Sequence, residues 1–345
     1  MSISVVGGAN ILITINGDQI HGLLQASLAT SNCFSADSFA LTFAIGPSPL
    51  GDLEFWSAIS TAYVEVSAVA QRGLTSRSLI TGMVDTILID PIQATVAIEG
   101  RDLSSSMIDS YRQQDFVNQS ASEVVSIIAQ HHGLAAVVVP TSGSVGRYYG
   151  DGYTRLSLGQ FSRLRSDWDL VVQLARENGF DVFISGTTLF FQPSTSSLDA
   201  PIPILTRNVQ RIRVQRTLTI TPDTSARVQS WNSHNMTSYD SNSPTADSSA
   251  TRASNIAGKQ AFLFSASNFT SQQVTDSANR YTAELGRLAK TLHLDMPWDF
   301  SLAPRSRILL CGTNTVLDTT YQIDSIERHY NCKSGSTQSI IAVVV

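Results

Sequence analysis

The sequence predicts a mainly β protein with an α/β insert. Residues 1–99 contain short runs of alternating apolar and polar residues between turn-forming residues, a pattern typical of barrels and sandwiches. From 100 to 204 the apolar residues recur with the period of a helix, and strand-like runs return from 205 to 345. Because the chain has 345 residues, two or three domains are expected.

The first region is predicted to be all β. Apolar residues alternate over 11–16, and Asn16-Gly17-Asp18 supplies a hairpin turn. The alternation recurs over 39–45, before the strand-breaking run GPSPLG. Further strands are predicted by the apolar runs at 63–69, 79–89 and 95–99.

Two helices with clear ends are predicted in the middle region. Ser120 and Glu123 form a capping box in front of an apolar stripe, and Gly133 follows that stripe. Trp168 lies on the apolar face of the second helix, which ends at Gly179 because glycine adopts the left-handed conformation at little cost. A short strand follows each helix.

The two helix–glycine–strand units align as 120–139 and 166–191, at a constant offset of 46 residues. The repeat predicts a paired α/β subdomain in which each helix covers the strand of the other copy. A chance likeness between two amphipathic helices is the alternative. In either case, the units are interpreted as packing modules.

The last region, 205–345, is predicted to be a second β domain. Residues 233–258 are rich in Ser, Thr, Asn and Ala, which predicts a long loop or a partly disordered segment. A single amphipathic helix is predicted at 271–290.

Charged residues make up only 15% of the chain, against about 25% in typical soluble domains. A surface poor in charge is expected where subunits meet, although a polar, Ser/Thr-rich β protein is the alternative. The net charge of −5 argues against tracking of nucleic-acid phosphates. Arg207, Arg211, Arg213 and Arg216 cluster, and we interpret them as one solvated or paired strand face.

Cysteine usage and hydropathy predict a soluble protein made in the cytoplasm. Cys33, Cys311 and Cys332 are an odd number without metal-site spacing, which fits reduced thiols; a bridge between Cys311 and Cys332 is not demanded. The first residues lack a basic start followed by an apolar run, so no signal peptide is expected. No stretch approaches the ~20 apolar residues of a membrane helix.

No catalytic, cofactor-binding or metal-binding residue is predicted. The six histidines lack the spacing of a zinc protease, and His131-His132 is expected to serve as a helix end. Neither a phosphate-binding loop nor a nucleophile elbow is present. The sequence therefore predicts a protein that is not an enzyme.

Several stretches in order resemble the late control protein D family, the baseplate hub proteins of contractile phage tails. They are VAIEGRDLSSSMIDS (96–110), QDFVNQSASEVVSIIAQHHGL (114–134), the run 166–193, ARVQSWNSHN (226–235) and the closing run 292–330. The resemblance covers nearly the whole chain from about residue 80 and rests on order and spacing. Its positions are Gly100, Arg101, Asp102, Ser120, Glu123, Gly133, Trp168, Gly179, Ser230, Trp231 and Pro297.

The resemblance implies two tail-tube-like β-barrel domains, 1–99 and 205–345, flanking the insert 100–204. It implies a homotrimer that presents six barrels in a ring, matching a hexameric tail tube on one side and a trimeric spike on the other. The implied partners are the tail-tube protein, the spike protein and other baseplate proteins, and DNA passes through the channel without specific binding. The implied location is the baseplate of a phage-like particle. The chain departs from the family pattern at residues 233–258, which lack the basic residues expected there.

Two alternative functions stay open from the residues alone. The first is a cell-wall hydrolase at the tail tip, with a pair of carboxylates as acid and base. The second is a glycan-binding tail adhesin that stacks sugars on tryptophan. The residues considered are the pairs Asp167 with Asp169 and Asp85 with Asp90 for the hydrolase, and Trp298 and Trp56 for the adhesin.

Overall fold

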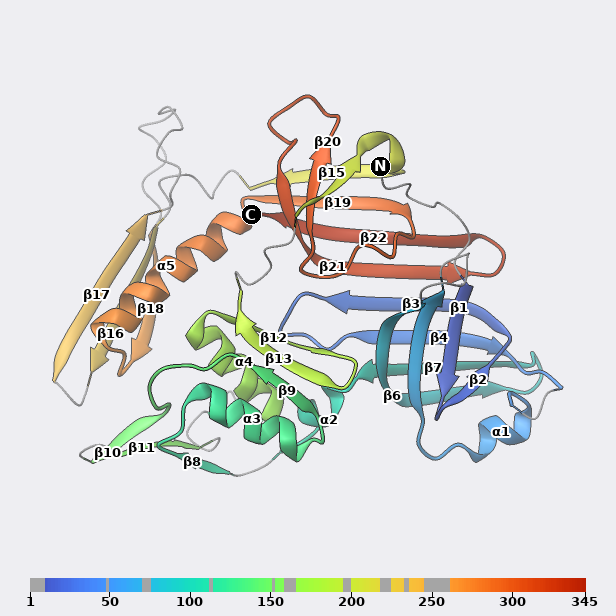
Figure 1. The fold of residues 1–345 in the computed structure, drawn as a ribbon, viewed down its shortest axis with the longest axis horizontal. Helices are drawn as coiled ribbons and strands as arrows, with labels where there is room; N and C mark the ends of the chain where they lie inside the picture. Colours follow the sequence, from blue (N-terminus) through green and yellow to red (C-terminus); the bar gives the residue numbers. More distant parts are fainter. Residues whose placement is uncertain are drawn as a thin grey trace.

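Four hydrophobic cores organise the described residues of this computed structural model (Figure 1). Two of them lie under one large sheet, one lies in the insert, and the smallest lies between a three-stranded sheet and a helix. The structure describes residues 10–47, 50–69, 76–111, 114–150, 153–157, 166–194, 200–217, 225–232, 236–244 and 261–345.

The first β region has the alternation that the sequence predicts. Leu28, Leu41 and Ile98 point into its core and are at most 1% exposed. A short helix, α1 (Leu53–Ala58), begins at Asp52, whose carboxylate accepts from the Phe55 N–H at 2.7 Å. The strands are β1 (Asn10–Ile15), β2 (Asp18–Ile20), β3 (Leu23–Ser31), β4 (Ser38–Ala44), β5 (Tyr63–Val69), β6 (Ser76–Asp90) and β7 (Thr95–Asp102).

The second β region is built in the same way around its own core, which includes Leu294, Ile326 and Ile340. A 3-10 turn, Thr206–Asn208, connects its first two strands. The strands are β14 (Ile202–Leu205), β15 (Arg211–Arg216), β19 (Lys290–Pro297), β20 (Arg307–Cys311), β21 (Thr320–Asn331) and β22 (Gly335–Val344).

The two β regions do not form two closed barrels, so the expectation of separate barrels is corrected. Instead, β3 pairs with β21 antiparallel, and the described strands of both regions join in a 13-stranded sheet. Its strand order is β15-β19-β22-β21-β3-β4-β7-β6-β5-β1-β2, with β20 pairing β21 and β14 pairing β20. The edge strand of the first region is thus used to continue the sheet rather than to close it.

Five strands of each region repeat one arrangement. Along the sheet the first region runs β5-β6-β7-β4-β3 and the second β20-β21-β22-β19-β15, with antiparallel neighbours throughout. The order along the chain is also the same, because β3, β4, β5, β6 and β7 correspond to β15, β19, β20, β21 and β22. Each long strand, β6 and β21, has a bulge, at Asp85 and at Asp324.

The insert follows β7 through the short helix α2 (Ser105–Ile108). Each longer helix packs mainly on the strand that follows it. Helix α3 also contacts β13 of the other copy, so the predicted arrangement, in which each helix covers the strand of the other copy, is present only as a minor contact among the described residues. The sheets are β10-β11-β8 and β12-β13-β9, and β9 runs parallel to β13. The elements are β8 (Asp115–Val117), α3 (Ala121–His131), β9 (Ala135–Val138), β10 (Arg147–Gly150), β11 (Tyr153–Ser157), α4 (Asp167–Asn178), β12 (Phe180–Ser185) and β13 (Thr188–Pro193).

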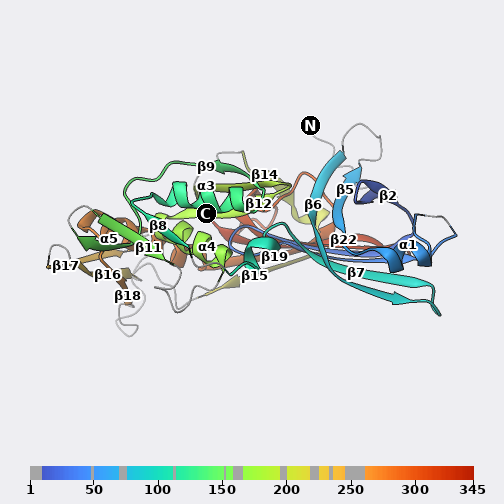
Figure 2. The same ribbon diagram turned by 90° about the horizontal axis from the view of Figure 1, so that it is seen from below.

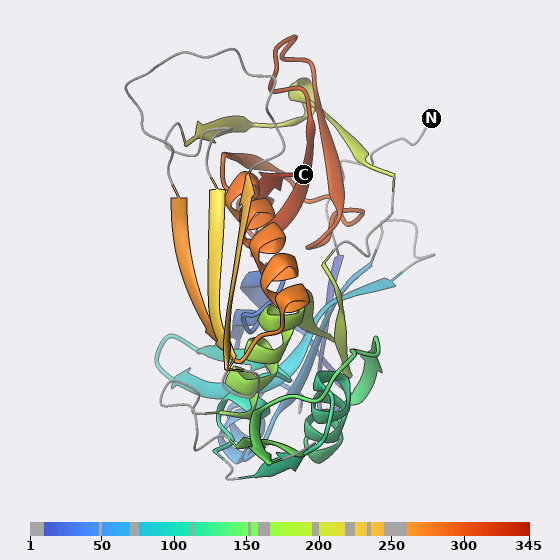
Figure 3. The ribbon, with the colours of Figure 1, turned by 90° about the vertical axis from the view of Figure 1, so that its left-hand side faces the viewer.

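A lateral unit interrupts the second β region between β15 and β19. Helix α5 (Ser271–Arg287) lies along one face of β16 (Ser225–Asn232), β17 (Thr237–Pro244) and β18 (Ala261–Ser267), as Figure 3 shows. Strand β17 lies inside the segment 233–258 that was expected to be a long loop or partly disordered, and residues 233–235 and 245–258 fall outside the described residues. The expected helix 271–290 ends at Arg287, because Lys290 already begins β19.

Candidate functional site

The large sheet has one face over the cores and an opposite face that is mostly small and polar. The side chains of the opposite face alternate with buried ones along each strand, and they are partly or fully exposed. We call this surface the polar face. In the first β region its members include Ser27, Ala29, Ser38, Ala40, Thr42, Asp85, Thr86, Ala97, Glu99 and Arg101, and in the second they include Arg211, Arg213, His293, Asp295, Glu327, His329, Thr337 and Ser339. Two exposed apolar side chains, Leu88 and Ile341, lie on the same face.

The pairing of β3 with β21 makes the polar face continuous. Ser27 lies directly opposite His329 in the ladder, and Ser27 Oγ is hydrogen-bonded to His329 Nδ1 at 3.2 Å. On the buried side of the same ladder, Leu28 lies opposite Arg328, which is 3% exposed and donates from Nη2 to the Leu302 carbonyl at 2.7 Å. The joint between the regions is therefore polar on one side and packed on the other.

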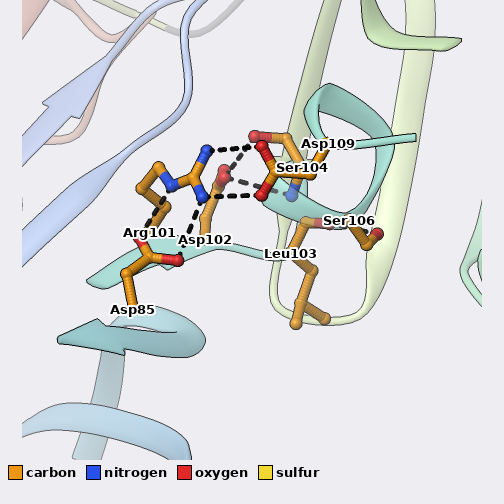
Figure 4. A network of polar contacts seen from close by, with 7 residues as sticks. All are labelled: Asp85, Arg101, Asp102, Leu103, Ser104, Ser106 and Asp109. Atoms are coloured by element: carbon orange, nitrogen blue, oxygen red, sulfur yellow. Dashed lines mark hydrogen bonds and ion pairs between the residues drawn. The ribbon is translucent and has the colours of Figure 1, made fainter. Parts of the chain in front are cut away.

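Arg101 is held on the polar face by two carboxylates, as Figure 4 shows. Its Nε donates to Asp85 Oδ2 at 2.7 Å and its Nη2 to Asp85 Oδ1 at 3.0 Å, a bidentate pair. Nη2 also donates to Asp109 Oδ2 at 2.8 Å. The hydrogen bonds that Arg101 donates to Asp85, and then those to Asp109, raise the pKa of Arg101 above its ordinary value. The guanidinium therefore stays protonated, and its positive charge is balanced by the two carboxylates.

The bulge at Asp85 explains this geometry, since the extra residue turns its carboxylate toward Arg101 on the adjacent strand. A shallow depression of about 440 Å³ on the polar face is lined by Ser27, Ser38, Glu99 and Arg101 among others. It is an open surface feature among small side chains, without a convergent set of nucleophile, acid and base.

Gly100 and Asp102, the neighbours of Arg101, have structural surroundings. A Cβ at Gly100 would lie 2.2 Å from the Met83 carbonyl oxygen and 2.5 Å from Cζ of Phe39, so only glycine fits between β6 and β4. Asp102 is 5% exposed, and its Oδ1 accepts from Ser104 N at 3.1 Å and Ser104 Oγ at 2.5 Å. Burial raises the pKa of Asp102 to about 6.

The predicted positions in the insert lie within its two helices and their ends, away from the polar face. The capping box predicted at Ser120 and Glu123 is present, and Glu123 Oε2 accepts from Ser120 N at 2.7 Å. Gly133 and Gly179 both have φ of +68°, the left-handed conformation expected after each helix. Trp168 is 5% exposed, and its indole N–H donates to the Phe34 carbonyl at 3.3 Å, which ties α4 to the β3–β4 connection.

Of the predicted positions near the C-terminal end, Ser230 and Trp231 lie in the lateral unit, whereas Pro297 lies opposite Thr337 of the polar face. Ser230 is buried in β16, where its Oγ accepts from Phe269 N at 3.0 Å and so fixes the turn before α5. Trp231, its neighbour, is 58% exposed on the face of the lateral sheet opposite α5. Pro297 ends β19, next to buried Trp298. A shared functional role for these positions stays a prediction.

The carboxylates considered for a hydrolase have other contacts. Asp167 Oδ2 lies 2.8 Å from His132 Nε2 in a buried pair between the end of α3 and the start of α4. Asp169 accepts from Ser166 N at 3.2 Å in the second capping box. Asp85 binds Arg101, and Asp90 Oδ1 accepts from the N–H groups of the β6–β7 turn.

The tryptophans considered for an adhesin are not available to stack on a sugar. Trp56 is 1% exposed and its indole N–H donates to the Gly51 carbonyl at 3.2 Å. Trp298 is 6% exposed and donates to the Thr337 carbonyl at 2.6 Å. Both tryptophans are therefore core residues.

The described residues contain no group of three or more His, Cys, Asp or Glu side chains placed to hold a metal ion. All three cysteines are free thiols. Within the same described ranges, no helix has the length and apolar character needed to cross a membrane.

Comparison with known proteins identifies the class of fold. No family model and no curated protein matches the sequence. A tail protein from Neisseria meningitidis MC58 is similar in structure with a TM-score of 0.72 and 12% identity, over 98% of this chain and 97% of that one. The 43 kDa tail protein of prophage MuSo2 from Shewanella oneidensis is similar with a TM-score of 0.69 and 14% identity, over 97% of this chain and 98% of that one.

An E. coli protein described as a component of the type VI secretion system gives a TM-score of 0.62 and 10% identity, over 96% of this chain and 76% of that one. At such identities the similarity establishes the fold. The chain therefore has the fold of phage tail proteins and of this secretion component, as the sequence resemblance implied.

The polar face itself was not foreseen as a site. Its signal in the sequence is the identity of the residues between the apolar ones: LLQASLATS and SFALTFA alternate core residues with Ser, Ala and Thr. On an ordinary solvent-exposed strand, charged residues would be common at such positions.

Proposed function

We propose that this protein is a structural baseplate hub of a phage-like contractile tail or related particle. In this proposal three copies form a ring around a central channel and adapt a trimeric spike to a hexameric tail tube. The ring also contacts other baseplate proteins and belongs to the particle rather than to the free cytoplasm. The protein performs no chemical reaction.

The observation that carries the proposal is the repeated strand arrangement joined through β3 and β21. One chain supplies two equivalent β units side by side, so three chains supply six. A threefold assembly can contact a sixfold tube evenly only when each chain offers such a pair. The low charge fraction of 15% also fits surfaces that are covered by other subunits.

In this proposal the polar face lines the channel. Its carboxylates include Asp85, Glu99, Asp295 and Glu327, while Arg101 is neutralised by Asp85 and Asp109. Arg211 and Arg213 lie on the same face, and Arg211 is within 3.8 Å of Asp295. A polyanion such as DNA would therefore meet small hydroxyl and methyl groups among charges of both signs, without the continuous basic surface that binds phosphates. Passage without specific binding follows from that surface.

The full chain, purified without partners, tests the ring. Sedimentation velocity should give a species with three times the mass of one chain, and electron microscopy of the same sample should show annular particles. The physical reason is that exposed sheet edges in each copy find partners in another copy. A single-chain mass at high micromolar concentration would contradict the proposal.

A further inference from the structure

Among the described residues, the large sheet has unpaired edges at β2, at β14, at β15 and along part of β6, and the last two concern us here. Strand β15 is the end of the strand order and pairs only with β19. Strand β6 pairs with β5 only as far as Met83; beyond Asp85, its residues 86–90 pair with β7 on one side and have an open second side. Leu88 in this segment is 69% exposed. Such unpaired edges are ready templates for another strand.

The chain already contains a joint made from the two corresponding edges. In the repeated arrangement β3 corresponds to β15 and β21 to β6, and β3 pairs antiparallel with β21 beyond its bulge at Asp324. The sequences at the two bulges agree as well: Val84-Asp85-Thr86-Ile87 corresponds to Ile323-Asp324-Ser325-Ile326.

We propose that β15 of one copy pairs antiparallel with residues 86–90 of β6 in a second copy of this chain. The contact joins unlike edges head to tail, as the β3–β21 joint does within one chain. This inference depends on the proposed function only for the number of copies in the closed ring. Figure 2 shows the β6–β7 hairpin projecting from the body of the molecule, where a second copy can reach it.

The internal joint also gives the register. Leu28 pairs with Phe39 in β4, and Val214 pairs with Leu292 at the corresponding place in β19, so Leu28 corresponds to Val214. Counting from the two bulges, Arg328 corresponds to Ile89. The internal pair Arg328–Leu28 therefore becomes Ile89–Val214 between copies, an apolar pair on the buried side.

One residue further along, the internal pair His329–Ser27 becomes Asp90–Arg213. A carboxylate then lies directly opposite a guanidinium, which is favourable across a strand pair. The other charges near the contact agree: Arg211 lies on the same side of β15 as Arg213, and Asp90 is the one charged residue in 86–90. Asp90 Oδ1 accepts from Ile92 N at 3.0 Å and Gln93 N at 2.9 Å, which fixes the carboxylate at the end of the strand.

A charge exchange in the full chain tests the register. Arg213→Asp places like charges opposite each other, and we expect the association constant from sedimentation velocity to fall about tenfold or more. Asp90→Arg should lower the association constant in the same way, because it places two positive charges opposite each other. The double variant Arg213→Asp/Asp90→Arg restores opposite charges and should return association to within a few-fold of wild type.

Lys333→Asp is the matched control, because it makes the same change of charge at an exposed position in the β21–β22 turn, away from both edges. It should leave association unchanged, and adding it to Asp90→Arg should give no rescue. Rescue by Lys333→Asp equal to that by Arg213→Asp would overturn the proposal, since it would show an effect of net charge alone.

A cysteine pair provides an independent readout that needs no change in assembly strength. In a Cys332→Ser background, Asp90→Cys with Arg213→Cys should form a disulfide between chains under mild oxidation, seen as dimers and longer species on a denaturing gel. Asp90→Cys with Arg216→Cys places the second thiol on the opposite side of β15 and should cross-link far less. Equal cross-linking of both pairs would overturn the register.

The outcomes separate this inference from the proposed function. Wild-type trimers that tolerate both charge reversals and do not cross-link would overturn the β15–β6 contact and leave the trimeric hub standing. Specific cross-linking into open chains without a trimer would support the contact and overturn the trimeric ring. A wild-type chain that stays monomeric and does not cross-link would overturn both.

Discussion

Two carboxyl groups, Asp37 and Asp102, lie together where β4 and β7 meet the insert. Asp102 N donates to the Asp37 carbonyl at 2.9 Å, and Asp37 Oδ1 accepts from Ser31 N at 2.7 Å. Burial raises the pKa of Asp37 to about 7 and that of Asp102 to about 6. Between pH 4 and 7 the folded chain therefore holds protons that the unfolded chain releases, so stability falls as the pH rises through this window.

Asp37→Asn should flatten this pH dependence. The wild-type free energy of unfolding is expected to decrease by about 2 kcal/mol from pH 5 to pH 8 on account of Asp37, because its folded pKa lies above the unfolded one. Asparagine keeps an oxygen for Ser31 N but does not titrate. Urea unfolding at several pH values measures the difference between the two proteins, and parallel profiles would contradict it.

At the scale of elements, the helices of the insert could be predicted because their signals are local. Ser120 with Glu123 and Ser166 with Asp169 form capping boxes, and glycine follows each helix. Strand β17 could not be predicted, because its Ser-, Asp- and Asn-containing sequence favours a loop and it becomes a strand through pairing with β16. The contacts of Trp231 and Ser230 likewise depend on tertiary packing.

The two equivalent glycines should respond differently to alanine. At Gly133 nothing lies within 4 Å of an added Cβ, so Gly133→Ala should cost about 1 kcal/mol of backbone strain. At Gly179 the added Cβ would lie 3.1 Å from Arg280 Cδ, and Arg280 Nη1 donates to the Glu177 carbonyl at 2.9 Å. Gly179→Ala should therefore cost about 1 kcal/mol more than Gly133→Ala.

Chemical denaturation of the two alanine variants under identical conditions measures this difference. Gly133→Ala is the matched control for backbone strain, since both glycines have the same φ. Equal losses would mean that Arg280 moves away freely and that α5 is not fixed to α4 by this contact.

For the whole molecule, the alternation within each strand was predictable, but the continuity of the sheet was not. Ser27 and His329 meet across the joint although they are 302 positions apart, and no local pattern selects β21 as the neighbour of β3. A closed barrel and a continued sheet have the same pattern of apolar residues. For this reason, the polar face could not be outlined from the sequence as one surface.

Arg305 connects three parts of the molecule. It lies in the second β region just before β20, its guanidinium is 3.3 Å from the ring centroid of Phe183 in the insert, and its Nη1 donates to the Asn32 carbonyl after β3. Burial lowers the pKa of Arg305, opposed by the charges of Asp37 and Asp181.

Arg305→Ala should destabilise the protein by about 2–3 kcal/mol, because it removes a desolvated cation–π contact and leaves the Asn32 carbonyl without this donor. Arg227→Ala is the control: it breaks an exposed, solvent-screened ion pair with Asp240 and should change stability much less than Arg305→Ala. Calorimetric unfolding of both variants measures the effect. A loss at Arg305 no greater than at Arg227 would contradict a connecting role.

The seam between β3 and β21 has one more consequence if copies of the chain associate as inferred. The joint within one chain and the joint between chains then use corresponding strands, so a single chain already contains the angle between neighbouring β regions. The angle between the two β regions of one chain would then set the number of copies in the closed ring. A substitution at the seam would thus alter how many copies complete the circle, even though it lies far from the surfaces where they touch.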